Sequence, residues 1–196
     1  PRPKDCSVTN TIIENNTLWE ALDTHAGENI IFANNTVRNC KKGIVATRIS
    51  RNVSGTDYFY FAPQNVHIIG NTVYGIGDGF GVAIAGASST PDSGTPKEYS
   101  EGCVVEGNTL IECGQEGNSL EGAMYFRETR GISVKGNNCK NCYVFGINMY
   151  YANNGFSITG NTVIDPQDNT YTAPSGIVLR AFYNINGVIS GNTTLL

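Results

Sequence analysis

The segment Val66-His-Ile-Ile-Gly-Asn-Thr-Val73 decides the fold, because close variants of it recur along the whole chain. Further copies are Val105-Glu-Gly-Asn-Thr-Leu110 and Ile158-Thr-Gly-Asn-Thr-Val163. The intervals between copies are unequal, as expected for a constant core with insertions of variable length. The asparagines that align in the seven copies are Asn16, Asn35, Asn71, Asn108, Asn137, Asn161 and Asn192.

Apolar residues flank each copy at fixed positions, and this alternation predicts a strand with one buried face. A second strand follows, usually opened by glycine and an apolar residue. Because one repeat cannot bury its apolar face alone, stacked repeats predict a solenoid. Three residues before the asparagine stand Ile13, Phe32, Ile68, Val105, Val134, Ile158 and Ile189, and two after it stand Leu18, Val37, Val73, Leu110, Cys139 and Val163. The second strands open at Ala21, Gly43, Gly81, Gly122, Gly146 and Gly176.

These phrases resemble the repeats of the right-handed parallel β-helix of the pectate-lyase-like superfamily, over nearly the whole chain. The resemblance implies an all-β solenoid of about six to seven rungs, forming one domain over residues 1–196. A β-propeller is the main alternative, but its repeats would be longer and more even. The last residues, Thr193 to Leu196, would leave an uncapped rung, so we expect the sequence to be a fragment of a longer chain.

Charge, hydropathy and cysteine spacing exclude several classes of binding partner. With 13 Lys+Arg against 17 Asp+Glu and a formal charge of -4, the chain lacks the basic surface that nucleic acid requires. No apolar run approaches the roughly 20 residues of a membrane-spanning helix, so we expect no membrane insertion. No second CxxC or histidine cluster completes a zinc site, so we expect neither metal nor cofactor. The repeat instead places five cysteines at apolar positions as buried free thiols: Cys40, Cys103, Cys113, Cys139 and Cys142.

The outward residues of the second strands form a strip, which we call the outer strip. Neighbouring rungs lie about 4.8 Å apart, so equivalent residues stack into two columns. Their aromatic, amide and arginine groups suit a polysaccharide or cell-wall glycan, with Arg127, Phe126, Asn148, Tyr150 and Arg180 as binding residues. The first column holds Asp23, Val45, Ala83, Met124, Asn148 and Val178, and the second holds His25, Thr47, Ala85, Phe126, Tyr150 and Arg180.

Carboxylates beside this strip are candidate catalysts. Asp78 and Glu121 each stand just ahead of a second strand, in adjacent rungs. A separation of about 5–9 Å would match the carboxyl pairs of retaining or inverting glycosidases. Glu128 flanks the same region, where Arg127 is a candidate ion-pair partner. The alternative is that these are solvated loop carboxylates.

Asp23-Thr24-His25 is the sharpest local group of ionisable residues. Both ionisable side chains are expected to point outward, with His25 as general acid or base and Asp23 orienting it. The stretch from Leu22 to Ile30 resembles a segment of β-helical phage tail proteins, in which glycine usually follows the histidine; here Ala26 takes that place. Alternatively, the pair stabilises a tight corner before Gly27.

The resemblance to phage tailspikes implies a polysaccharide depolymerase that hydrolyses a glycosidic bond with a carboxylate pair. It further implies a homotrimer located outside the cell or on the virion surface. Two alternatives stay open: a non-catalytic β-helix that binds glycan or acts as a structural module, and a bacterial polysaccharide lyase or epimerase. A calcium-dependent lyase is disfavoured, because the outer strip carries no stacked acids.

Overall fold

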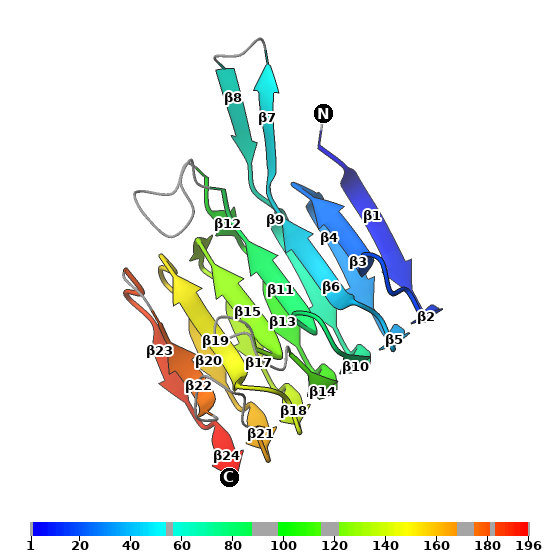
Figure 1. The fold of residues 1–196 in the computed structure, drawn as a ribbon. Coiled ribbons are helices and arrows are strands. Elements are labelled where there is room, and N and C mark those ends of the chain that lie inside the picture. Colours follow the sequence, from blue (N-terminus) through cyan, green and yellow to red (C-terminus); the bar gives the residue numbers. More distant parts are fainter. Residues whose placement is uncertain are drawn as a thin grey trace.

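The computed structural model describes residues 2–53, 57–87, 98–114, 122–167, 175–180 and 183–195. Every regular element in these residues is a strand, and nearly all of them belong to three parallel sheets that run side by side along the molecule (Figure 1). We call these sheets A, B and C. The chain passes through one strand of each in turn to complete a rung, and the next rung then stacks on the one before it. The all-β parallel solenoid predicted from the repeats is therefore confirmed.

Sheets A and B each contain one strand from every rung. Sheet A consists of β1 (Lys4–Thr9), β4 (Glu28–Ala33), β9 (Gln64–Ile69), β13 (Val104–Glu106), β17 (Ser133–Lys135), β20 (Ser157–Thr159) and β23 (Val188–Ser190), joined at its side by β12 (Ser100–Glu101) and β16 (Thr129–Arg130). Sheet B consists of β2 (Ile12–Glu14), β5 (Thr36–Arg38), β10 (Thr72–Ile76), β14 (Thr109–Cys113), β18 (Asn138–Lys140), β21 (Thr162–Ile164) and β24 (Thr193–Leu195). Seven rungs result, at the upper end of the predicted number.

Sheet C holds the second strand of each repeat. Its members are β3 (Glu20–His25), β6 (Lys42–Thr47), β11 (Val82–Ala85), β15 (Met124–Arg127), β19 (Phe145–Tyr151) and β22 (Ser175–Leu179). After β6 the chain leaves the solenoid as an antiparallel hairpin, β7 (Ile49–Val53) and β8 (Asp57–Phe61), which projects beyond the sheets in Figure 1.

The recurring phrase forms the corner between sheets A and B. The strand of sheet A ends before the glycine, and the strand of sheet B begins after the asparagine. The first of the two residues between these strands has a left-handed backbone, with φ of 63° at Gly70, 64° at Gly107 and 54° at Asn34. Glycine and asparagine adopt this conformation most readily, which explains why they alternate there.

Inside the coil, equivalent apolar residues stack in continuous columns. Ile68 pairs with Val105, Val105 with Val134 and Val134 with Ile158, and all four side chains are fully buried. Stacking of identical positions buries the apolar face that a single rung would leave in water. The column predicted from the aligned phrases is thus present.

The first rung departs from the predicted alignment. Thr11, rather than Asn16, occupies the asparagine column, since its backbone N–H donates to Oδ1 of Asn35 at 3.0 Å. Ile13 pairs with Val37 in sheet B, and Leu18, expected to be buried, is 81% exposed. Asn15-Asn16 copies the phrase but forms the next corner, where Asn15 has a φ of 61°. Asparagine suits either corner, so the sequence match placed this rung in the wrong register.

Candidate functional site

Sheet C sets which side chains face outward, and its fourth rung differs from the prediction by one residue. Ala83 pairs with Tyr125, which pairs with Asn148, so Tyr125 holds the place predicted for Met124. Phe126 pairs with Ile84 and Met149 and is fully buried in the core. The predicted outward placement of Phe126 is therefore wrong, and Arg127 takes its position in the outer strip. Ala123-Met124, rather than Gly122-Ala123, is equivalent to Gly81-Val82.

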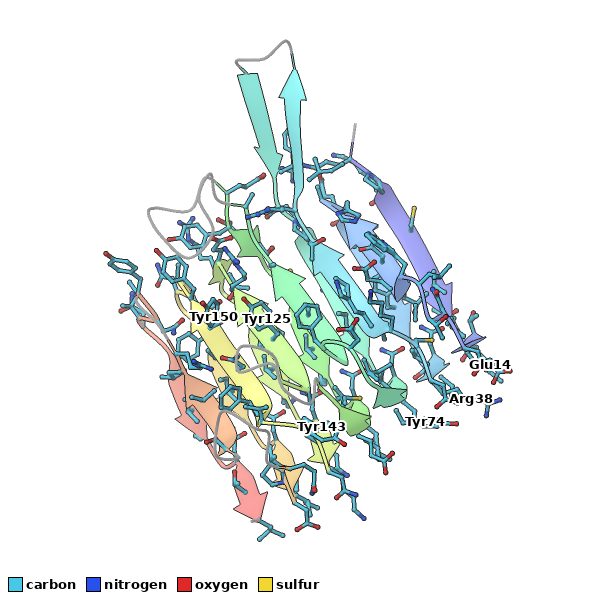
Figure 2. All side chains as sticks on the ribbon, in the orientation of Figure 1. Glu14, Arg38, Tyr74, Tyr125, Tyr143 and Tyr150 are labelled. Carbon is cyan, nitrogen blue, oxygen red and sulfur yellow. The ribbon has the colours of Figure 1, made fainter. Side chains whose placement is uncertain are left out.

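The middle of the outer strip is covered by aromatic rings. The Phe80 and Tyr125 ring centroids are 5.3 Å apart, and those of Tyr125 and Tyr150 are 5.5 Å apart, both pairs being stacked. Figure 2 shows Tyr125 and Tyr150 close together on neighbouring strands. Asn148, a predicted sugar ligand, is fully buried, and Tyr150 is only 9% exposed. An outer aromatic cluster therefore forms on sheet C from Phe80, Val45, Ala83, Tyr125, Tyr150, Tyr151 and Ala152.

The charged residues at the end of these strands pair within the protein. Arg127 Nη2 lies 2.9 Å from Oε1 of Glu128, whose side chain is fully buried. Glu128 has a φ of 54° at the corner after β15. The Arg180 guanidinium lies 5.2 Å from the centroid of the Phe145 ring. Glu128 therefore has no surface to offer a substrate in this structure, although it was predicted as a catalytic residue.

Asp23 and His25 do come together. Nε2 of His25 lies 2.9 Å from Oδ2 of Asp23, while Nδ1 lies 3.0 Å from the carbonyl oxygen of Arg48 and 3.2 Å from Oγ1 of Thr47. Both ring nitrogens are thus held by protein atoms, so neither is left for a substrate. This geometry favours the corner-stabilising interpretation of the pair over the catalytic one.

The pKa of Asp23 is raised, chiefly because burial disfavours its charged form, with Glu20 adding to the effect and His25 opposing it. Asp23 and His25 also line a pocket of about 450 Å³, together with Val8 of the first rung and with Ile30 and Phe32 of the second.

Asp78 lies in a different setting, at the corner between sheets B and C. Its Oδ2 is 3.3 Å from Nζ of Lys41 in the preceding rung, and both side chains are partly exposed. The predicted partner of Asp78, Glu121, lies outside the described residues. A pocket of about 430 Å³ opens at this corner, and we call it the corner pocket; its lining is Thr17, Asn39, Cys40, Lys41, Gly75, Gly77 and Asp78.

The sequence did not reveal Lys41 and Asn39 as parts of a site. Both lie just after β5, opposite Gly75 and Gly77 of the next rung. Asn39 and Lys41 follow Asn35 of the asparagine column by four and six residues, and Asn39 has the same left-handed backbone, with a φ of 51°, as Gly75 at 66°.

The cysteines are free thiols, as predicted. Five are buried, and only Cys6, in the end rung, is exposed. Burial raises the pKa of Cys103 to about 12, which makes that thiol unreactive at neutral pH. In the described part of the chain, no three histidine, cysteine or acidic side chains gather as metal ligands would.

Fold and site together define a seven-rung parallel β-solenoid that carries a polar pocket at one corner. Within the described ranges, no helix has the length and hydropathy needed to cross a lipid bilayer. Comparisons with protein-family models, with curated proteins and with solved structures find no match to this chain.

Proposed function

We propose that the protein binds a polysaccharide at the corner pocket. The observation that carries the proposal is the pocket's lining, which combines the hydroxyl of Thr17, the amide of Asn39 and the Lys41–Asp78 ion pair. Sugar hydroxyls both donate and accept hydrogen bonds, so this mixture of short donors and acceptors suits them. A volume of about 430 Å³ accommodates a short stretch of a glycan chain.

One partly exposed aromatic side chain, Phe80, lies near the pocket along the chain. Phe80 follows Asp78 by two residues and remains partly exposed, whereas the rings stacked behind it are buried. A sugar ring bound at the pocket would have an apolar platform in Phe80 and polar partners in Asp78 and Lys41. This arrangement moves the proposed binding site from the middle of the outer strip to its edge.

Cleavage of the bound chain is the second candidate function, because the carboxylate of Asp78 lines the pocket. In this proposal Asp78 acts with Glu121 as the carboxylate pair of a glycosidic hydrolysis. The protein would then be a depolymerase of the tailspike type, working outside the cell or on a virion surface. Binding without cleavage corresponds to the non-catalytic module, and elimination to a lyase.

The test is binding and cleavage of a panel of bacterial capsular, O-antigen and cell-wall polysaccharides. We expect Asp78→Ala and Phe80→Ala each to weaken binding at least tenfold. Glu106→Gln is the matched control, since Glu106 is also a partly exposed carboxylate paired with a lysine, Lys135, at 3.4 Å, but on sheet A. Equal binding by the parent and Asp78→Ala would overturn the pocket assignment.

The same panel separates the activities. Glu121→Gln that binds normally but no longer releases reducing ends supports the depolymerase. Tight binding with no cleavage by the parent supports the binding module, and unsaturated products detected by ultraviolet absorbance support a lyase.

A further inference from the structure

Two buried thiols face each other across neighbouring rungs inside the solenoid. β14 and β18 pair in parallel, with Ile111 opposite Lys140. The backbone N–H of Tyr143 donates to the carbonyl oxygen of Cys113 at 2.9 Å, which carries the register past the strand ends and sets Cys113 opposite Cys142. Neighbouring strands lie about 4.8 Å apart, within the roughly 4.4–6.8 Å that a disulfide spans between Cα atoms.

Both side chains point into the core, where water does not compete for them. Cys113 is fully buried and Cys142 is 1% exposed. Cys139, three residues before Cys142, is a third buried thiol beside them. Hydrogen bonds from Cys113 and Cys139 lower the pKa of Cys142, whereas burial is the main cause that raises the pKa of Cys113. These contacts therefore favour the thiolate form at Cys142 over the other two cysteines.

We propose that Cys113 and Cys142 are an oxidation site, which forms a disulfide between the fourth and fifth rungs on exposure to a peroxide. The Cys142 thiolate attacks hydrogen peroxide, so that an S–O bond forms, the O–O bond breaks and hydroxide leaves. Cys113 then attacks the sulfenic sulfur, forming the S–S bond and releasing the second oxygen as water. The protons of the two thiols complete the two water molecules, so two thiols are oxidised and one peroxide is reduced.

The same column contains an internal control. Cys40 occupies the equivalent corner position two rungs earlier, since the backbone N–H of Asn39 donates to the carbonyl oxygen of Tyr74 at 3.1 Å. Its neighbour in the next rung is Ile76, which in turn pairs with Cys113. Cys40 is thus as buried as the proposed pair but has no thiol opposite it. Ile76 also shows that an aliphatic side chain fits this column.

The experiment uses the full chain with Cys6→Ser, which removes the exposed thiol and with it any link between molecules. The folded protein is treated with hydrogen peroxide and mapped by mass spectrometry of non-reduced peptides. We expect one linkage, Cys113–Cys142, with Cys40 still free for alkylation after unfolding, and a higher Tm than the reduced protein.

Two variants make the assignment falsifiable, and both replace a buried thiol by an aliphatic group of similar size. Cys113→Val should abolish the linkage, whereas Cys139→Val should leave it intact. A Cys139–Cys142 linkage, a linkage that includes Cys40, or retention of all buried thiols would each overturn the proposal.

Discussion

Asn71 donates from Nδ2 to Oδ1 of Asn108 at 2.9 Å, and its backbone N–H reaches the same oxygen at 2.9 Å. Nδ2 of Asn71 also donates to the carbonyl oxygen of Phe32 in the rung before, at 2.9 Å. One side chain therefore ties together the A–B corners of three successive rungs. The pattern repeats from Asn35 to Asn192, which explains why the phrase requires asparagine rather than another polar residue.

Replacing an internal member of this column should be costly. In Asn108→Ala, the buried N–H and Nδ2 of Asn71 lose their acceptor, and each unsatisfied buried donor costs about 1–3 kcal/mol. We expect the free energy of unfolding in urea to fall by about 2–4 kcal/mol. Asn192→Ala takes the same acceptor from Asn161, but in the more exposed end rung, where water can replace it, so it should cost less, about 1–2 kcal/mol. Equal losses at both positions would contradict a role for burial.

Close approach of the backbone between rungs should make Gly43 irreplaceable. A Cβ at Gly43 would lie 2.0 Å from the carbonyl oxygen of Gly81, whereas one at Gly77 would meet nothing within 4 Å. We expect Gly43→Ala to lower the free energy of unfolding by about 3 kcal/mol or more, since rigid backbone cannot move aside. Gly77→Ala should change it by less than about 1 kcal/mol. A loss of less than about 1 kcal/mol in Gly43→Ala would contradict the close approach of the Gly43 and Gly81 backbones.

The corrected register of β15 can be tested through Phe126. Because its ring is fully buried against Ile84 and Met149, Phe126→Ala should reduce the free energy of unfolding by about 3–5 kcal/mol. Trp19→Ala removes a larger ring that is 64% exposed and should cost less than about 1 kcal/mol. Chemical denaturation measures the loss of unfolding free energy in both variants. Similar losses would contradict the burial of Phe126.

Asp23 should make stability depend on pH. Burial raises the pKa of Asp23, so its carboxyl group holds a proton more tightly in the folded state than in the unfolded state, where aspartate has a pKa of about 3.9. Its contribution is fully present below that value and is lost as pH rises through the raised pKa. Asp23→Asn removes the titration, so its stability relative to the parent should improve as pH rises from about 4 through the raised pKa of Asp23. Thermal unfolding across that interval measures the difference, and a constant or declining difference would contradict the assignment.

Parts of this molecule were predictable from sequence because they repeat. Ile68, Val105, Val134 and Ile158 share one environment, and a signal repeated in many rungs survives local exceptions. The errors fell where a rung lacks such support. Asn15-Asn16 matches the repeated phrase in sequence but lies at a different corner of the rung. In the fourth rung, Ala123 occupies the position that is glycine in other rungs.

The site was less predictable than the fold, because contacts between rungs depend on insertions of unequal length. Lys41 and Asp78 are far apart in sequence and meet only after the register is fixed. The covering of Asn148 by aromatic rings likewise follows from Tyr125, whose outward position depends on a one-residue shift.

The asparagine column has a direction. Each side-chain oxygen faces the first rung and accepts from the preceding asparagine, so the asparagine-to-asparagine hydrogen bonds all run in one direction along the axis. The two ends of the column therefore differ: Oδ1 of Asn35 accepts from the backbone N–H of Thr11 at 3.0 Å, whereas Nδ2 of Asn192 donates to the carbonyl oxygens of Ile158 and Ser190. A segment that packs against the first rung would therefore meet different hydrogen-bonding groups from one that packs against the last rung.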